Sequence, residues 1–254
     1  RGERAGERHA GQLAGVGAMS VAIERTYLGR IPALIVRPTG RPVALPTVLW
    51  LHGFGADKEV HLPELCRFAE TGLLAVGIDA VGHGQRRFIE FSSQFSRSSP
   101  ESVELFDSCV RQTVAELPEL IDLLVERGSS DPARIAVAGV SMGACMVYAA
   151  IADERRIRAA VAMLGSPEAP NSDAGRPLGE RFFPTALLSI TAGQDTVVPP
   201  DAARVLHQGL EPRYQARPER LRYCEIARAS HFLQPEEWDG AVAQASAWLV
   251  SFLS

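Results

Sequence analysis

The chain has 254 residues, 46% of them hydrophobic, and its 26 basic and 30 acidic side chains give a net charge of −4. Both signs are spread along the sequence, which excludes the concentrated basic surface of a protein that binds nucleic acid or acidic membranes. This length and hydrophobic content allow one large core, and the charge balance favours small neutral or mildly charged partners.

The N-terminal segment and the apolar runs predict the domain boundaries and the compartment. Residues 1–18 are rich in Gly, Ala, Arg and Glu, which predicts a disordered or extra leader before a single domain over residues 19–254. No run approaches the ~18 apolar residues of a membrane span, and no apolar signal core is visible. Four separated cysteines without a C-x-x-C pair favour reduced thiols. We therefore expect a cytoplasmic protein without membrane contact; the oligomeric state stays open, with a homodimer among the candidates.

Strand-like and helix-like segments alternate along the chain. Residues 21–28 and 31–36 predict a hairpin around Gly29-Arg30. Buried strands are predicted at 47–51, 73–78, 134–138, 157–164, 185–191 and 221–226. Helices are predicted at 59–71, 101–127, 144–153, 201–209 and 236–253. This order predicts an α/β fold, a doubly wound and mainly parallel sheet with an antiparallel N-terminal hairpin. The longest loops, 85–100 and 166–183, are too short for a large cap domain.

The segment Gly139-Val140-Ser141-Met142-Gly143 lies between a predicted strand and a predicted helix. A serine at such a turn is held in a strained conformation with its hydroxyl exposed, and flanking glycines allow the close backbone approach that the turn requires. The helix that follows directs its unpaired amides toward developing negative charge. Ser141 is therefore a candidate nucleophile, with Gly139 and Gly143 forming the elbow. The bare pattern also arises by chance, so the prediction depends on its partners.

A serine hydroxyl needs a base, and an imidazole oriented by a carboxylate can supply it near neutral pH. His231 follows the last predicted strand, and Asp195 follows strand 185–191, at the same expected sheet edge as Ser141. The chain order Ser141, Asp195, His231 matches one serine-hydrolase architecture. Asp201 is the alternative acid, although its position predicts a helix-capping role. His207 and His61 are expected to be solvated or capping side chains.

These segments, with the turn His52-Gly53-Phe54-Gly55, resemble the α/β-hydrolase fold superfamily over residues 21–254. They are most similar to small bacterial carboxylesterases of the dienelactone-hydrolase-like and prolyl-oligopeptidase-like groups. The resemblance implies an oxyanion hole from the backbone amides of Phe54 and Met142. It also implies that His52 supports its turn, with a second base as the alternative reading. Dienelactone hydrolases proper carry cysteine where this chain has Ser141, so lactone hydrolysis is not implied.

Aromatic side chains near these turns are expected to line an apolar acyl pocket, although each could equally pack in the core. The candidates are Phe54, Phe88, Phe91, Phe95, Met142, Phe182, Phe183 and Phe232, with His52 and His83 as further lining residues. Cys145 is expected to point into the helix packing instead.

The sequence thus predicts a serine hydrolase of carboxylic esters, comparable to EC 3.1.1, that acts on short-chain or small aromatic acyl groups through an acyl-enzyme. Thioesterase, amidase and small-peptide hydrolase activities would use the same three residues and stay open as alternatives. A non-catalytic hydrolase-fold binding protein is the alternative from another class. No metal-ligand spacing or nucleotide-binding glycine motif is visible, so we expect no metal and no cofactor, and a small-molecule ester as partner.

Overall fold

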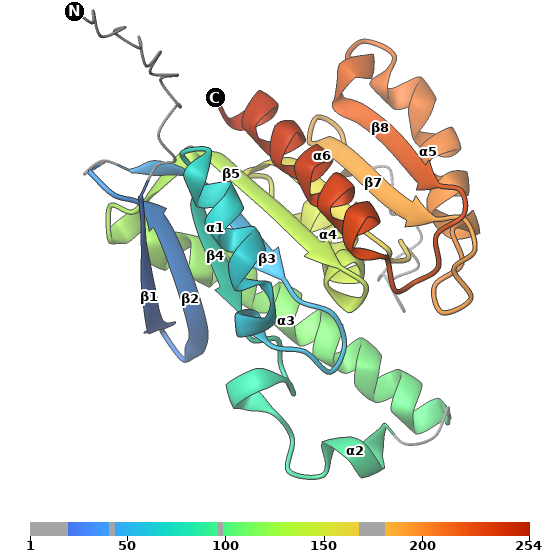
Figure 1. The fold of residues 1–254 in the computed structure, drawn as a ribbon, viewed down its shortest axis with the longest axis horizontal. Helices are drawn as coiled ribbons and strands as arrows, with labels where there is room; N and C mark the ends of the chain where they lie inside the picture. The colour runs from blue at the N-terminus through green and yellow to red at the C-terminus, as the bar shows by residue number, and fades with distance from the viewer. Residues whose placement is uncertain (1–19, 41–43, 96–98, 168–180) are drawn as a thin grey trace, which may run out of the picture.

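The computed structural model describes residues 20–40, 44–95, 99–167 and 181–254 (Figure 1). The predicted leader 1–18 and most of the predicted loop 166–183 lie outside these ranges. No helix among the described residues has the length and apolar character needed to cross a bilayer.

The described residues form one eight-stranded sheet with the order β1-β2-β4-β3-β5-β6-β7-β8. The strands are β1 (Val21–Leu28), β2 (Ile31–Pro38), β3 (Leu45–Leu51), β4 (Leu74–Ile78), β5 (Ser130–Val140), β6 (Ile157–Met163), β7 (Ala186–Ala192) and β8 (Leu221–Ile226). β1 pairs antiparallel with β2, and β2 with β4, whereas β4, β3, β5, β6, β7 and β8 run parallel. The predicted hairpin and parallel sheet are confirmed.

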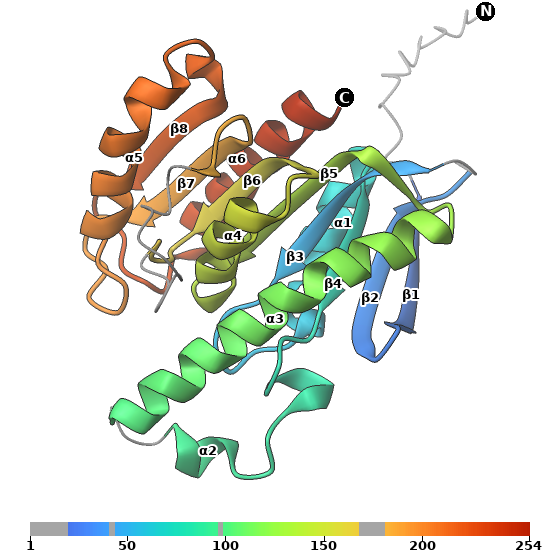
Figure 2. The same cartoon turned by 180° about the vertical axis from the view of Figure 1, so that it is seen from behind.

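Helices cover both faces of this sheet. The covering helices are α1 (Leu62–Glu70), α3 (Pro100–Glu126), α4 (Met142–Asp153), α5 (Asp201–Tyr214) and α6 (Pro235–Leu253), whereas the short α2 (Phe91–Gln94) lies beyond the edge of the sheet. α1 and α6 lie on the face toward the viewer in Figure 1, and α3, α4 and α5 lie on the face shown in Figure 2. Every residue of β7 is buried, as expected for a strand covered on both sides. The predicted doubly wound α/β fold without a large cap is therefore confirmed for the described residues.

The predicted helix 59–71 divides into two pieces. Asp57 accepts hydrogen bonds from the backbone N–H groups of Glu59 and Val60 and so caps a short 3₁₀ turn, Lys58–His61. Pro63 then stands in the first turn of α1, where its fixed φ favours a helix start and its missing N–H costs little. This division turns His61 and Glu64 toward the carboxyl edge of the sheet, where the candidate site lies.

The prediction that His207 is solvated or capping is wrong. This side chain is buried under α5, and its Nε2 lies 2.7 Å from the hydroxyl oxygen of Ser189 on β7. Burial lowers the pKa of His207 to about 4, so the imidazole is neutral at pH 7. The sequence pattern placed His207 within a helix but did not specify which face of that helix packs on the sheet.

We expect the stability to fall as the pH drops from 7 to 5, and His207 to contribute part of this loss. Its pKa is lower in the folded protein, about 4, than in the unfolded chain, about 6.5, so the unfolded chain takes up the proton first. The contribution of this residue is complete above pH 6.5 and falls by about 2 kcal/mol at pH 5.

Urea unfolding of the wild type and His207→Gln at pH 7 and pH 5 measures this contribution. The free energy of unfolding should fall about 2 kcal/mol less in the variant than in the wild type. An equal fall in both proteins would contradict the assignment.

Candidate active site

Ser141 occupies the turn between β5 and α4 with a φ of 55°. This positive φ is strained for a residue with a side chain, and close packing of the neighbouring turns enforces it. A Cβ on Gly139 would lie 2.7 Å from the backbone of Gly143, and a Cβ on Gly143 would clash with the backbone oxygen of Leu51. Glycine at both elbow positions is therefore a steric requirement of this turn.

Ser141, His231 and Asp195 are brought together by the carboxyl ends of β5, β8 and β7. The Ser141 Oγ lies 3.0 Å from His231 Nε2, and His231 Nδ1 lies 2.7 Å from Asp195 Oδ2. Because a carboxylate only accepts, Nδ1 carries the proton and the neutral ring presents an unprotonated Nε2 to the serine hydroxyl. The other oxygen, Asp195 Oδ1, accepts hydrogen bonds from the backbone N–H groups of Val197 and Val198 at 2.8 Å each.

Asp201, the alternative acid, lies elsewhere. Its side chain is 77% exposed and pairs with Arg204 at 2.6 Å on the surface of α5. Asp195 is buried and already contacts the imidazole. The geometry therefore favours Asp195 over Asp201 as the partner of His231.

The turn after β3 packs directly against Ser141. A Cβ built on Gly53 would lie 3.6 Å from Ser141 Cβ, so the two turns are in contact. Among the described residues, neither the Phe54 N–H nor the Met142 N–H donates to a protein acceptor. Two amides without a protein acceptor among the described residues thus lie beside the serine, in adjoining turns.

His52 supports this turn from behind. Its Nε2 accepts a hydrogen bond from the Ala80 N–H at 3.0 Å, so Nδ1 carries the proton that is donated to the Gly53 carbonyl oxygen at 2.8 Å. Burial lowers the pKa of His52 to about 4, with the nearby His83 acting in the same direction. Both ring nitrogens are engaged by the backbone, and this geometry favours the supporting role over a second base.

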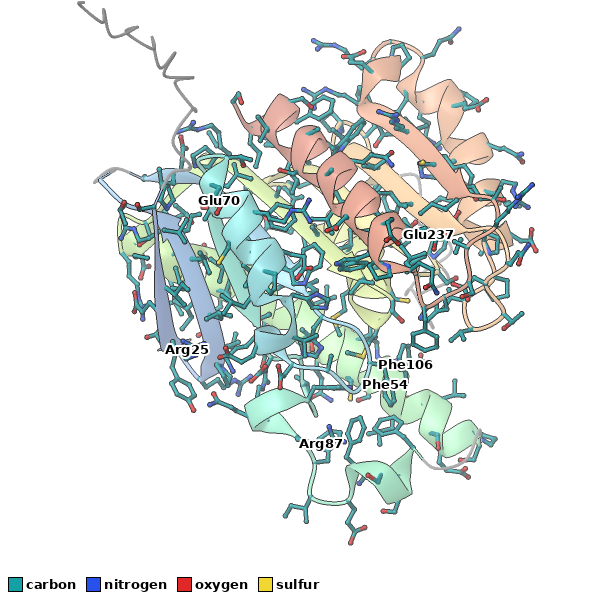
Figure 3. The ribbon with its side chains drawn as sticks, viewed as in Figure 1. Arg25, Phe54, Glu70, Arg87, Phe106 and Glu237 are labelled. Atoms are coloured by element: carbon teal, nitrogen blue, oxygen red, sulfur yellow. The ribbon has the colours of Figure 1, made fainter. Side chains whose placement is uncertain are left out.

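Two cavities open at Ser141 and share Phe54 and Val197. The first has a volume of about 670 Å³ and the second about 590 Å³. Side chains that line the first include Phe54, Phe95, Phe106, Met142, Cys145 and Val198. Side chains that line the second include His61, Glu64, Leu164, His231, Phe232 and Trp238. Phe54 and Phe106 lie side by side near α2 in Figure 3, with ring centroids 6.0 Å apart.

Several predicted lining residues lie away from these cavities. Phe182 is fully buried against Tyr148, and Phe183 contacts Tyr214, because both phenylalanines precede β7 and so lie at the amino edge of the parallel sheet. Phe88 packs over Gly82, which has no side chain to oppose the ring. The predicted lining roles of these three phenylalanines are wrong.

His52, His83 and Phe91 also stay outside the two cavity walls. His83 is buried behind Phe54, with ring centroids 5.3 Å apart, and Phe91 contacts both rings. These residues therefore do not line the cavities, contrary to the prediction. They form a layer behind the cavity wall that holds Phe54 in place.

Cys145 and His61 line the cavities, although the sequence predicts helix packing for Cys145 and a solvated or capping position for His61. Cys145 lies four residues, about one helical turn, after Ser141, so both side chains face the first cavity. His61 is buried, not solvated, and lines the second cavity. The i, i+4 spacing could have predicted the position of Cys145, whereas that of His61 depends on the packing of α1 against α6.

A buried ion pair anchors the turn beneath Phe54. Lys58, the one lysine of the chain, places its Nζ 2.9 Å from Asp79 Oδ2, and both side chains are almost completely buried. Asp79 also accepts hydrogen bonds from the backbone N–H groups of Lys58 and Gln85. The pair links the segment after β3 to the turn after β4 that carries His83.

We expect Lys58→Met to lower the free energy of unfolding by about 3–5 kcal/mol, because Asp79 then stays buried without its cation. The control is Arg25→Met, which breaks an exposed pair with Glu59 and should cost less than about 1 kcal/mol. Urea unfolding at pH 7 measures both values. Equal losses would show that the buried pair has no special role.

The sheet, the strained serine turn and the contact chain of Ser141, His231 and Asp195 together define a hydrolase of the α/β type. A family model described as "Alpha/beta hydrolase family" matches residues 48–252. The chain belongs to the alpha/beta hydrolase family. Among the described residues no group of three or more His, Cys, Asp or Glu side chains is arranged to hold a metal ion.

Bacterial relatives and a solved structure agree with this membership. YitV of Bacillus subtilis (strain 168), provisionally named an esterase, is 25% identical over 92% of this chain and 100% of its own length. The esterase YjfP of Escherichia coli (strain K12) is 29% identical over 58% of this chain and 56% of its own length. A provisionally named dienelactone hydrolase from Klebsiella pneumoniae shares the fold, with a TM-score of 0.72 at 18% identity over 92% of this chain and 100% of that chain. The two bacterial relatives support a hydrolase of the esterase kind, and the solved structure supports the fold.

Proposed function

We propose that the protein is a serine hydrolase of carboxylic esters that forms an acyl-enzyme on Ser141. The observation that carries the proposal is the continuous hydrogen-bonded chain from the Ser141 hydroxyl through His231 to the buried Asp195 carboxylate. A strained serine turn and the esterase names of two relatives support it. Catalysis needs no group beyond those on the chain and water.

In the first step the Ser141 Oγ attacks the ester carbonyl carbon while His231 Nε2 takes the hydroxyl proton. The carbonyl oxygen becomes negatively charged as the C–O double bond opens, and the amides of Phe54 and Met142 donate hydrogen bonds to it. Asp195 stabilises the imidazolium that forms and holds its orientation.

The intermediate collapses when the bond to the leaving alcohol breaks and the imidazolium returns its proton to that oxygen. Water then attacks the acyl-enzyme, with His231 again taking a proton, and releases the carboxylic acid and the free serine. Each proton taken by His231 is given back within the same half-reaction, so the enzyme ends unchanged.

The first cavity supports short-chain or small aromatic acyl groups as substrates. Its wall combines the rings of Phe54, Phe95 and Phe106 with the side chains of Met142 and Cys145. Such a wall stabilises apolar groups by removing their surface from water, at about 25 cal/mol for each Å² buried. No charged side chain lines this cavity among the described residues, which disfavours acyl groups with a second carboxylate.

Parallel assays with a butyryl ester, thioester and anilide test the proposal and rank the alternative activities. We expect the ester to have the highest kcat/KM, and a fluorophosphonate probe to label the peptide that contains Ser141 in the folded protein. A higher value for the thioester or anilide would reassign the substrate class. Failure of the probe to label folded protein would favour the non-catalytic alternative.

A further inference from the structure

The second cavity is a separate arm of the site with a different chemical character. It shares Ser141 with the first cavity but is lined by His231, which the first cavity does not contact. The leaving group must lie on the His231 side, because the imidazolium gives its proton to the leaving oxygen. The second cavity is therefore the one that would receive the alcohol part of an ester.

A buried carboxylate lines this second arm. Glu64, in the first turn of α1, accepts a hydrogen bond from Trp238 Nε1 at 2.7 Å, and its other oxygen lies 3.5 Å from His61 Nδ1. Burial acts to raise the pKa of Glu64, but hydrogen bonds from His61 and Trp238 outweigh it and hold that pKa below its usual range. The carboxylate is thus ionised at neutral pH.

Among the described residues that line the cavity, only the imidazole of His61 can compensate the negative charge of Glu64. No Arg or Lys side chain lines this arm among the described residues, and His61 is the one titratable group in contact with the carboxylate. Arg67, the basic residue of α1 one turn further on, pairs with Asp239 at 2.6 Å instead. A carboxylate can accept about four hydrogen bonds, so Glu64 keeps capacity for a ligand.

The walls around Glu64 are aromatic. Trp238 and His61 have ring centroids 5.7 Å apart, and Phe232 contacts His231 at the entrance to the same arm. The faces of aromatic rings attract cations, and an ammonium group inside a desolvated aromatic pocket gains most from a nearby carboxylate.

We propose that the second arm selects esters whose alcohol carries a positively charged ammonium group, with Glu64 and Trp238 as the residues that recognise the charge. The proposal rests on the proposed ester hydrolysis at Ser141 and adds the class of leaving group. If Glu64 only ties α1 to α6 through Trp238, the result should differ: the enzyme would not discriminate between charged and neutral alcohols.

The test compares butyrylcholine with 3,3-dimethylbutyl butyrate, which has the same shape but carbon in place of the charged nitrogen. We expect the wild type to have a kcat/KM at least about tenfold higher for butyrylcholine. Glu64→Gln keeps an oxygen that can accept from Trp238 but removes the charge, and should reduce the ratio of the two values toward one.

Glu70→Gln is the matched control, since it changes the net charge equally. Glu70 is exposed at the other end of α1, far from Phe54 in Figure 3, so this variant should keep the wild-type ratio. A wild-type ratio near one, or an unchanged ratio in Glu64→Gln, would overturn the proposal.

Calorimetric titration of choline into Ser141→Ala separates this proposal from the proposed function. Choline binding that Glu64→Gln weakens, with hydrolysis of neither ester by the wild type, would support the cation site and overturn ester hydrolysis. Hydrolysis that depends on Ser141 but shows no charge preference would do the reverse. Absence of both binding and hydrolysis would overturn both.

Discussion

Replacing Ser141 by alanine should lower kcat for a butyryl ester by roughly 10⁵-fold or more, with little change in KM. Alanine fits the positive φ no worse than serine, and within the described part of the chain His231 is the one side chain that contacts the hydroxyl. The fold and both cavities should therefore persist while the acyl-enzyme cannot form. Residual hydrolysis would come from positioning of water by the remaining groups.

Steady-state kinetics with unfolding curves of both proteins check this result. Ser230→Ala is the control, because Ser230 precedes His231 but its exposed hydroxyl makes, among the described residues, one long contact of 3.4 Å with the Phe232 carbonyl oxygen. We expect this variant to retain activity within about twofold, as is usual for exposed substitutions. A loss below about tenfold in Ser141→Ala would remove the serine from the mechanism.

Asp195→Asn should lower kcat by roughly 10³–10⁴-fold, again with a small effect on KM. The reason lies in the two backbone N–H groups of Val197 and Val198, which both donate to Asp195 Oδ1. In asparagine the amide oxygen would take that position, and the NH₂ group would face His231. The imidazole would then accept at Nδ1 and carry its proton on Nε2, where it cannot take the proton of Ser141.

Asp201→Asn supplies the matched comparison, since the same substitution at an exposed residue only breaks a surface pair with Arg204. We expect its kcat to match the wild type within about twofold. Similar losses of kcat in both variants would mean that the contact between Asp195 and His231 does not explain the loss in Asp195→Asn. Far-UV circular dichroism should show that both proteins keep the native fold.

The local patterns of the sequence predicted the parts of the site that depend on backbone geometry. The glycines of the elbow must be glycine because of contacts between turns, as seen at Gly143 against Leu51. The carboxyl ends of parallel strands meet at one edge, so residues that directly follow β5, β7 and β8 had to gather there. This rule places Ser141, Asp195 and His231 at one edge of the sheet, and the loops that follow β7 and β8 bring the three side chains into contact.

The walls of the cavities were much harder to predict, because they depend on which side chains of each helix and loop face the site. Phenylalanine is equally suited to core and cavity, so composition could not separate Phe106 from Phe182. Chain position could have excluded Phe182 and Phe183, since both precede a strand and so lie at the wrong edge.

The sequence by itself determined the sheet, the serine turn and the three residues at its edge. The apolar pattern of each strand and the glycines on either side of the serine are visible in short segments, and residues that follow parallel strands gather at one edge. Only the tertiary structure decided that His61, Glu64 and Trp238 form one arm of the site. Glu64 and Trp238 are 174 positions apart and meet because α1 and α6 cover the same face of the sheet (Figure 1). No pattern within either helix predicts this contact, because each helix forms its own backbone hydrogen bonds regardless of which element packs against it.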